Sequence, residues 1–423
     1  MSKRPAMTEL HREAFDYAPN MRRLRAVIAV AEAGSVMRAA EALHLSQPAV
    51  TRAVRDLEKE LGLALFERHR SGMLCTTAGK IVLHRFRRAL QQLIEAETAL
   101  ARLHPEGNFE RLPQRLSHRQ LTVLVAVADL HNEPLAAKRL GLTQPAVSGN
   151  LRDLERLLGI ALFLRTQRGM LATDGGAVLI RHAKMALREL SLVSDDLSAW
   201  QGEVRGRVVI GTLPLSSSLL VPHAVDALLR ELPGLNVTII EGTYDALFES
   251  LRHGEIDILI GALRQAGTSE DTHQQRLFHD RLAVAARQGH PLMKHAALQL
   301  SDLLDAQWIA PRQGTPARVS FEQEFRSAGL QPPSVVVESG NLSTIRTLLL
   351  DSDRVTLVSP HQVFFEVQSG QLALLPIKLT GTLRPIGITT RADDSPTQAL
   401  KVLKDILLTL GERMADPSSA TRA

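Results

Sequence analysis

Residues 45–50 read LSQPAV and residues 142–147 read LTQPAV, 97 residues further on. Two such hexapeptides indicate either a duplicated domain or a short turn motif that has recurred by chance. Residues 21–90 align without a gap on residues 118–187 at the same offset, with about 30 of 70 positions identical. Self-similarity over this length is far above chance, so we interpret the repeat as two copies of one structural unit.

Each copy is predicted to form a helix-turn-helix. In the first copy, apolar residues at helical spacing begin near Leu24, and a second helix is expected to begin after Ser35. Ser46 is a good N-cap for a third helix, and Pro48 suits its first turn because a missing N–H is harmless there. Gly62 should end that helix. Two helices joined across a tight turn are typical of DNA-binding units.

The segment ALFERHRSGMLCTTAG (64–79) predicts a two-stranded wing behind this helix pair. A recognition helix enters the major groove by its N-terminal end, so that end and the wing should carry the DNA contacts. On the helix these candidates are Gln47, Thr51, Arg52 and Arg55, and on the wing they are Arg68 and Arg70. Gln can pair with adenine and Arg with guanine, while wing arginines suit phosphates or the minor groove. In isolation, the helix arginines would be taken as ordinary exposed residues.

The second copy keeps the scaffold but changes the predicted reading face. Thr51-Arg52-Ala53 becomes Ser148-Gly149-Asn150, and a mid-helix Gly costs on the order of 1 kcal/mol relative to Ala. The second copy could read a different sequence, bind phosphates alone or serve only in assembly. Its DNA-binding candidates are Thr143, Gln144, Ser148, Asn150, Arg152, Arg165 and Arg168.

A long amphipathic helix is expected after each unit, with a stripe through Val82, Phe86 and Leu93 in the first. One-sided helices of this length need a partner, and symmetric pairing in a homodimer would supply one. The predicted segments are an N-terminal extension (1–20), a first winged helix-turn-helix (21–78), a linker helix (79–103), a connector (104–117), a second winged helix-turn-helix (118–175), a second linker or dimerisation helix (176–204), an effector-binding domain (205–410) and a tail (411–423).

From Arg207 the sequence alternates between strand and helix patterns, which predicts an α/β domain with parallel sheets. Ligands of such sheets bind at the carboxyl ends of strands, beside helix N-termini. The candidates at these places are Leu213, Pro214, Ser216, Ser217, Ala262, Arg312, Thr315, Ser339, Asn341 and Ser359. For any single Ser or Thr, a plain helix-capping role is equally expected. Few of these loops are charged, which slightly favours a neutral or singly charged ligand.

Composition limits the classes of protein to consider. The first 200 residues carry 29 Lys and Arg against 21 Asp and Glu, whereas the remainder carries 21 against 24. A basic front half suits a polyanion. The sequence shows neither a secretory signal nor an apolar stretch long enough for a membrane span, so a cytoplasmic protein is expected. The single cysteine, Cys75, fits a reducing compartment and a small hydrophobic role.

Taken together, the motifs resemble the LysR-type transcriptional regulators. In the front half the resemblance rests on AAEALHLSQPAVTRAVRDLEKELGLALFER (39–68) and on TTAG (76–79). In the back half it rests on VIGTLPLSSSLLVP (209–222) and on the segment from LRELPGLNV to DILIGAL (229–263). The back half is most similar to the subfamily that includes the galactose-binding-protein regulator. SGQLALLPI (369–377) resembles the return crossover between lobes.

The resemblance implies a multidomain protein with winged helix-turn-helix units, linker helices and a two-lobed α/β domain like the periplasmic binding proteins. Lobe 1 would comprise residues 205–265 and 371–410, and lobe 2 residues 266–370. A small molecule bound between the lobes would modulate binding to a double-stranded operator, by a dimer or dimer of dimers. By motif position, the base-reading roles fall to Ser46, Gln47, Thr51 and Arg52. Arg55 takes a phosphate role and Arg68 the wing role, and Pro48 is also a DNA-binding candidate. Two winged units in one chain depart from the family pattern.

The alternative function is a cytoplasmic small-molecule binding protein without a regulatory role. An enzyme is least expected, since the sequence has no Gly-rich phosphate loop, no G-x-S-x-G elbow and no metal-ligand spacing. We therefore predict no catalytic residue, no metal and no cofactor. A sugar, a sugar acid and an aromatic acid all remain candidate effectors, and no membrane partner is expected.

Overall fold

The computed structural model describes residues 21–70, 72–264, 271–295, 297–392 and 395–415. The chain divides into two compact units. The first unit contains residues up to Gly206 together with residues 253–255, and the second contains residues 207–252 and those from Ile256 onward. The predicted N-terminal extension (1–20) lies outside the described residues. The predicted tail begins later than expected, because the last helix continues to Ala415.

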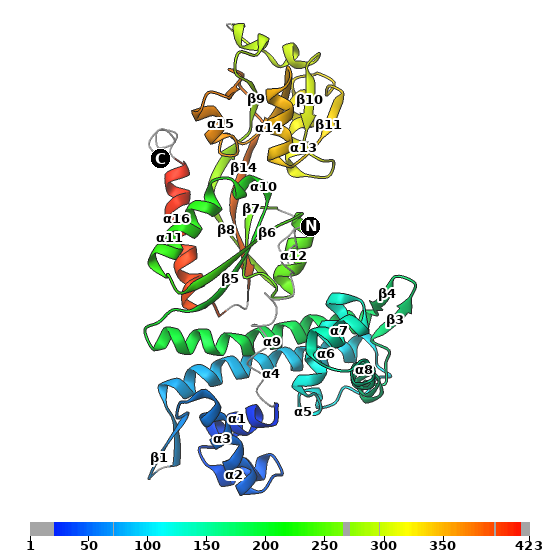
Figure 1. Cartoon of the computed structure of the whole chain (residues 1–423), viewed down its shortest axis with the longest axis vertical. Helices are drawn as coiled ribbons and strands as arrows, with labels where there is room; N and C mark the ends of the chain where they lie inside the picture. Colours follow the sequence, from blue (N-terminus) through cyan, green and yellow to red (C-terminus); the bar gives the residue numbers. More distant parts are fainter. Residues whose placement is uncertain (1–20, 71, 265–270, 296, 393–394, 416–423) are drawn as a thin grey trace, which may run out of the picture. The chain divides into compact units, whose positions relative to one another are not determined.

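The first unit begins with three helices and a hairpin (Figure 1). These are α1 (Met21–Ala33), α2 (Val36–Ala42), α3 (Gln47–Leu61), β1 (Phe66–His69) and β2 (Gly72–Cys75), with the strands antiparallel. The predicted limits of α3 are confirmed. Ser46 is its N-cap in extended backbone, although its side chain makes no capping bond, and Gly62 ends it in the left-handed region at φ 67°. Burial raises the pKa of the Cys75 thiol, in keeping with its predicted unreactive role.

The segment from 118 to 172 has the same order of elements. It contains α6 (His118–Leu130), α7 (Glu133–Leu140), α8 (Gln144–Leu158), β3 (Phe163–Thr166) and β4 (Gly169–Ala172). The two segments also share a tertiary contact between the third helix and the hairpin. The Glu58 carboxylate accepts the N–H of Leu65 at 2.8 Å, and the Glu155 carboxylate accepts the N–H of Leu162 at 2.8 Å.

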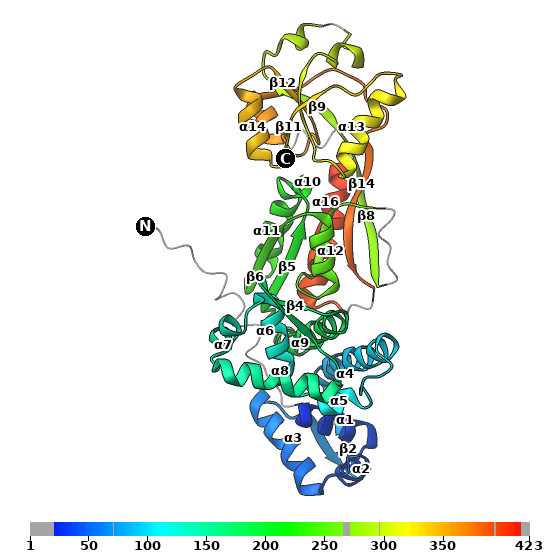
Figure 2. The same ribbon diagram turned by 90° about the vertical axis from the view of Figure 1, so that its right-hand side faces the viewer.

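Two 27-residue helices follow the hairpins, α4 (Thr77–Leu103) and α9 (Asp174–Trp200), with the short α5 (Leu112–Arg115) between the halves. Thr76 caps α4 by accepting the N–H of Gly79 at 2.9 Å. Gly79 is needed there, since a Cβ would lie 2.1 Å from the Leu65 carbonyl oxygen. The predicted stripe on α4 is buried, and α9 of the same chain lies along α4 (Figures 1 and 2).

The second unit holds two five-stranded sheets (Figure 2). The first sheet has the order β6-β5-β7-β14-β8, and the second has the order β11-β10-β12-β9-β13. The strands are β5 (Gly206–Thr212), β6 (Leu235–Glu241), β7 (Ile258–Ala262), β8 (Thr272–Arg281), β9 (Ala283–Arg287), β10 (Gln307–Ala310), β11 (Val335–Glu338), β12 (Arg354–Val358), β13 (Leu372–Leu374) and β14 (Leu383–Arg391). Both sheets are mixed rather than parallel, because β14 runs antiparallel to β7 and β9 antiparallel to β12.

Helices cover these sheets. They are α10 (Pro214–Ser217), α11 (Leu220–Glu231), α12 (Tyr244–Arg252), α13 (Pro316–Ser327), α14 (Leu342–Leu350), α15 (Phe364–Gln368) and α16 (Gln398–Ala415), with short 3₁₀ turns at η3 (Pro291–Lys294) and η4 (Leu300–Leu303). Among the described residues, no helix is both long and apolar enough to cross a membrane.

The chain crosses between the two sheets later than the sequence suggests. The predicted outward crossing lies at residue 266, but β8 remains in the first sheet through its long antiparallel pairing with β14. The crossing therefore falls at Leu282, between β8 and β9. The return crossing falls after β13, which pairs with β9 in the second sheet, rather than at residue 371.

Candidate nucleic-acid interface and ligand site

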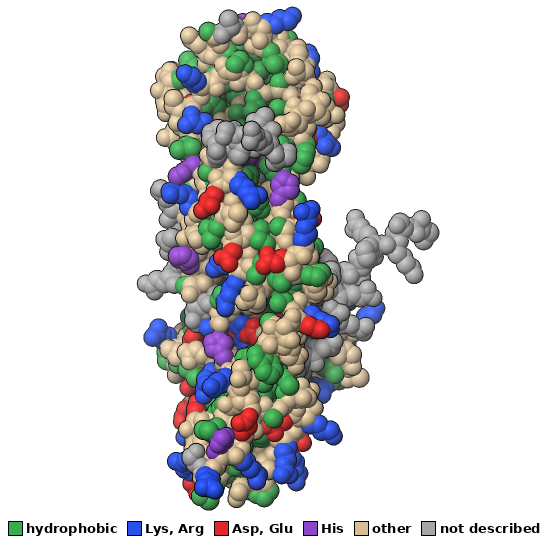
Figure 3. Space-filling model, turned by 90° about the vertical axis from the view of Figure 1, so that its left-hand side faces the viewer, with side chains coloured by type: hydrophobic (Ala, Val, Ile, Leu, Met, Phe, Trp, Pro, Cys, Tyr) green, Lys and Arg blue, Asp and Glu red, His purple; other side chains and the backbone are tan. Residues whose placement is uncertain are grey.

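The first winged segment presents four arginines to solvent. Arg52 and Arg55 lie on α3, and Arg68 and Arg70 lie on and beside β1; all four are exposed. Their side chains form no hydrogen bond or ion pair with any other residue that the structure describes. Figure 3 shows Lys and Arg side chains gathered on the surface of this segment, at the lower end of the view.

Helical spacing explains why these side chains face outward. Val50, Val54 and Leu57 are buried at successive turns of α3 and fix its inner face. Arg52 and Arg55 fall between them on the opposite face, as predicted. Of the remaining candidates, Ser46, Gln47 and Pro48 are exposed at the start of α3, and Thr51 is half-buried. All of the predicted DNA-binding residues of this copy are therefore at least partly accessible.

In the second winged segment, a buried carboxylate holds two of the predicted DNA-binding side chains. Glu133, in the first turn of α7, is only 6% exposed and accepts hydrogen bonds from the side chains of Ser148 and Arg165. The Arg165 bond measures 2.8 Å. The residue 97 positions earlier is Val36, so the first copy has no such acid. Sequence reasoning missed Glu133, although the change from Val to Glu at aligned positions was a visible signal.

Other candidates on this segment are also held by their own chain. The Asn150 amide donates to the Ala146 carbonyl at 2.7 Å, and the Arg152 Nε donates to the Ser148 carbonyl at 3.3 Å. Thr143, Gln144 and Arg168 are exposed. More of the candidate side chains are therefore bonded to their own chain in the second segment than in the first.

The ligand candidates of the first sheet converge at one edge. Leu213 follows β5 and its N–H donates to the Ile260 carbonyl of β7 at 3.0 Å, so it lies beside Ala262 at the end of that strand. Ser217 in α10 donates its hydroxyl to the Pro214 carbonyl at 2.9 Å. Ser216 is 1% exposed, and its hydroxyl has no hydrogen-bond partner among the described residues. A buried hydroxyl without a partner is costly, so Ser216 is the best candidate here for a ligand contact.

In the second sheet, the candidates mainly cap helices. Thr315 caps α13 by accepting the Arg318 N–H at 3.3 Å, and Asn341 caps α14 by accepting the Thr344 N–H at 2.9 Å. The Ser339 hydroxyl accepts the Asn341 N–H at 3.2 Å, while Arg312 is exposed. These side chains lie at the carboxyl ends of adjacent strands, as predicted, but the polar atoms of Thr315, Ser339 and Asn341 already bond to the backbone.

Ser359 belongs to a buried cluster that the sequence did not reveal. Its hydroxyl donates to the Asp280 carboxylate at 2.8 Å, and the same carboxylate accepts two N–H groups of Arg384 at 3.0 and 3.2 Å. Asp280 is the second-last residue of β8 and Arg384 the second residue of β14, the strands that lead to and from the second sheet, while Ser359 follows β12. Burial lowers the pKa of Arg384, which Asp280 opposes. The cluster ties both crossing strands to the second sheet.

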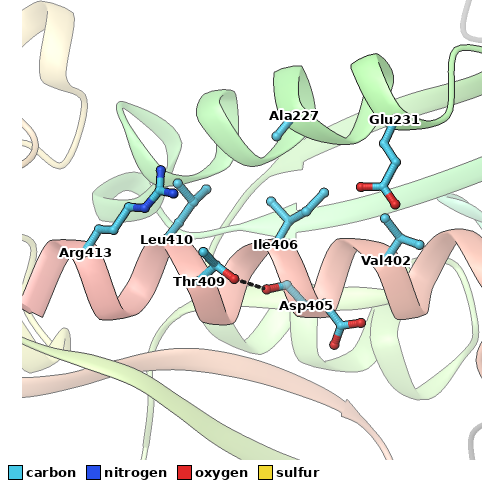
Figure 4. Close-up of a pocket in the computed structure, with 8 residues that line it drawn as sticks. All are labelled: Ala227, Glu231, Val402, Asp405, Ile406, Thr409, Leu410 and Arg413. Atoms are coloured by element: carbon cyan, nitrogen blue, oxygen red, sulfur yellow. Dashed lines mark hydrogen bonds between the residues drawn. The ribbon is translucent and has the colours of Figure 1, made fainter.

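A shallow groove of about 360 Å³ lies elsewhere, between α11 and α16 (Figure 4). None of the predicted ligand residues lines it. Its walls are formed by Ala227, Glu231, Val402, Asp405, Ile406, Thr409, Leu410 and Arg413. Among the described residues, no group of His, Cys, Asp and Glu side chains is placed to hold a metal ion.

A helix-turn-helix with exposed arginines, joined to two sheets with candidate ligand residues at their strand ends, is typical of ligand-responsive DNA-binding regulators. The pattern for bacterial regulatory helix-turn-helix proteins of the lysR family matches residues 21–80 and again residues 118–177. The pattern for the LysR substrate binding domain matches residues 201–411. The chain belongs to the LysR family of transcriptional regulators, with a DNA-binding helix-turn-helix and a two-lobed effector-binding domain.

Relatives span most of the chain. It is 40% identical to the HTH-type transcriptional regulator GalR of Pseudomonas putida over 374 residues, or 88% of this chain and 93% of the relative. It is 31% identical to GbpR of Azospirillum brasilense over 73% of this chain and 93% of that protein. Among solved structures, CbnR matches with a TM-score of 0.51 and 22% identity over 70% of this chain and 99% of that chain. The last similarity concerns the fold alone.

Proposed function

We propose that this chain controls transcription by binding a double-stranded operator through α3 and the β1–β2 wing, under the control of a small molecule held between the lobes. Lobe 1 is the part built on the β5 sheet, and lobe 2 is the part built on the β10 sheet. The protein acts in the cytoplasm as a homo-oligomer, without catalysing a reaction. The observation that carries the proposal is the set of four exposed arginines that have no partner among the described residues.

The DNA half is tested by titrating labelled duplexes, selected from a random library by the full chain, across a range of salt concentrations. A bidentate contact from Arg to guanine is worth about 1–3 kcal/mol, so Arg52→Ala should weaken the selected duplex roughly 5- to 150-fold and relax its selectivity. Arg55→Ala should weaken selected and random duplexes alike and lower the salt slope by about 1. Arg230→Ala, an exposed arginine of α11, is the charge-matched control and should change neither.

Equal binding of selected and random duplexes by the wild-type chain would refute this function. It would favour the alternative of a small-molecule binding protein.

We also propose that the second winged segment binds DNA, chiefly through phosphates. Its exposed Arg168 supports this, while Glu133 reduces the positive charge near Arg165. Glu133→Val installs the residue of the first copy and should strengthen binding and steepen the salt dependence. Loss of Arg165 and Arg168 together should do the reverse. If neither change affects affinity or salt slope, this segment does not bind DNA.

The effector half is supported by Ser216, whose buried hydroxyl would gain a partner from a polar ligand. A screen of sugars, sugar acids and aromatic acids by thermal shift should identify a compound that raises Tm, since a ligand at 100 times its Kd adds about 2.7 kcal/mol. Ser216→Ala should leave the Tm of the free protein unchanged or higher, because it removes an unsatisfied group, and should reduce the shift caused by the ligand. An unchanged ligand shift would exclude Ser216 from the site.

A further inference from the structure

The helix pair α4–α9 is antiparallel and contains a buried ion cluster. Arg85 of α4 is 1% exposed and donates to Asp196 at 2.7 Å and to Glu189 at 2.9 Å, both on α9. Arg88 donates to the other oxygen of Glu189 at 2.8 Å. Seven residues further along α4, the Gln92 side-chain oxygen lies 3.1 Å from the imidazole of His182, and the Glu95 carboxylate lies 3.9 Å from the same ring.

These two sets of contacts are equivalent under the internal repeat. Residue 85 plus the offset of 97 is residue 182, and residue 189 minus 97 is residue 92. The contact Arg85–Glu189 therefore corresponds to His182–Gln92, with the roles of the two helices exchanged. Such reciprocity, in which position i of one copy meets position j of the other and the reverse, is the signature of a two-fold symmetric interface.

We infer that α4 and α9 form an internalised dimer interface, so that one chain holds two unlike DNA-binding heads and takes a duplex with two unlike half-sites. The interface is now asymmetric in chemistry, since the Arg85–Glu189 pair corresponds to a His182–Gln92 contact between side chains that carry no opposite charges. Pairing α4 with α4 of another chain in the same register would place Arg85 at the position of His182, beside Gln92 and Glu95. Glu95 is a single carboxylate, 42% exposed and 3.9 Å from His182, whereas the α4–α9 pair gives Arg85 both Glu189 and Asp196 within 2.9 Å. The better-matched guanidinium favours pairing of unlike helices.

Cross-linking tests the pairing without DNA. In a Cys75→Ser background of the full chain, Gln92→Cys and His182→Cys replace two side chains that touch. After oxidation or treatment with a short bismaleimide, the denatured, unreduced product should run as a single cross-linked chain, in a yield independent of protein concentration. Gln91→Cys with His182→Cys is the control, since Gln91 is exposed on the neighbouring position and should cross-link at least tenfold less.

A product of two chains would mean that the helices pair between copies, and no product with either reagent would mean that they do not pair at all. Either result overturns the inference.

The half-site prediction rests on the proposed function and is tested separately, by sequencing duplexes selected from the random library. The motif should contain two unlike elements, and Arg52→Ala should erase preference in one of them alone. A motif built from a single repeated element would overturn the prediction of unlike half-sites. If no duplex is selected, the proposed DNA function fails, while the cross-linking result still decides the helix pairing.

Discussion

The cluster of Asp280, Ser359 and Arg384 should control the stability of the effector-binding domain. Replacing Asp280 by Asn keeps the shape of the side chain but removes the charge that holds Arg384. The carboxylate side chain is 1% exposed and the guanidinium 13% exposed, so the remaining cation would lie almost buried without a counter-charge. Asn also brings an amide donor toward a group that has only donors.

The expected loss is about 3 kcal/mol, the lower end of the 3–5 kcal/mol found when one member of a buried pair is removed, since Arg384 keeps slight contact with solvent. For a domain of this size, 1 kcal/mol shifts Tm by roughly 2–4 °C, so the transition of this domain should fall by about 6–12 °C. Differential scanning calorimetry of the full chain measures this directly. Replacing the pair together, by Asp280→Leu with Arg384→Met, should recover much of the loss.

The matched control is Asp226→Asn, in an exposed pair with Arg230 one turn along α11, with side chains 58% and 79% exposed. Such surface pairs contribute about 0.3–0.5 kcal/mol, which corresponds to a shift of at most about 2 °C. If Asp280→Asn shifts Tm no more than this control, then the buried charge pair does not stabilise the domain and the reasoning is wrong.

Two further predictions concern the first unit. Burial, helped by Arg181, lowers the pKa of His182 to about 4 from an ordinary 6.5, so the unfolded chain binds the proton more readily. The stability that the neutral imidazole contributes should be complete above pH 6.5 and should decline by at most about 3 kcal/mol as the pH falls to 4. Urea titrations at a series of pH values should show this decline. His182→Gln should make the free energy of unfolding less dependent on pH. Gly79→Ala should lower the free energy of unfolding by more than about 2 kcal/mol, because the new Cβ would lie 2.1 Å from a backbone carbonyl oxygen. Gly149→Ala, in open space on α8, should raise it by up to about 1 kcal/mol in the same urea assay.

Features encoded by neighbouring residues could be predicted from the sequence. The limits of α3 follow from Ser46, Pro48 and Gly62, which lie within 17 positions of one another. Strands at residues 206–212 and 258–262 follow from short apolar runs bounded by turn residues. Local signals of this kind act through backbone preference, which depends little on the rest of the fold.

Contacts between distant residues could not be predicted in this way. Asp280 and Arg384 are 104 positions apart, and Arg85 and Glu189 are also 104 apart. Nothing near any of these residues distinguishes it from a solvated charge, because its partner is chosen by sheet pairing or helix packing. Thr315 and Asn341 show the opposite limit: the sequence marks them equally as ligand contacts or caps, and only the geometry identifies them as caps.

The buried ions on α4 and α9 are better understood through partner choice than through stability. A buried ion pair is weak evidence for stability, since desolvation offsets much of its attraction and apolar substitutes are often as stable. The equivalent positions in the other half, His182 and Gln92, do without charge and still pack. Arg85 adds a desolvation cost to any helix pairing in which Glu189 and Asp196 do not contact its guanidinium. Both carboxylates lie on α9, and an α4–α4 pair would offer in their place only Glu95, which is 42% exposed and 3.9 Å from His182 at the equivalent position. The penalty therefore falls on α4–α4 pairing and not on the pair within the chain. A repeat that retained two identical linker helices would have no such preference, so divergence at these few positions is what makes the internal pair the favoured one.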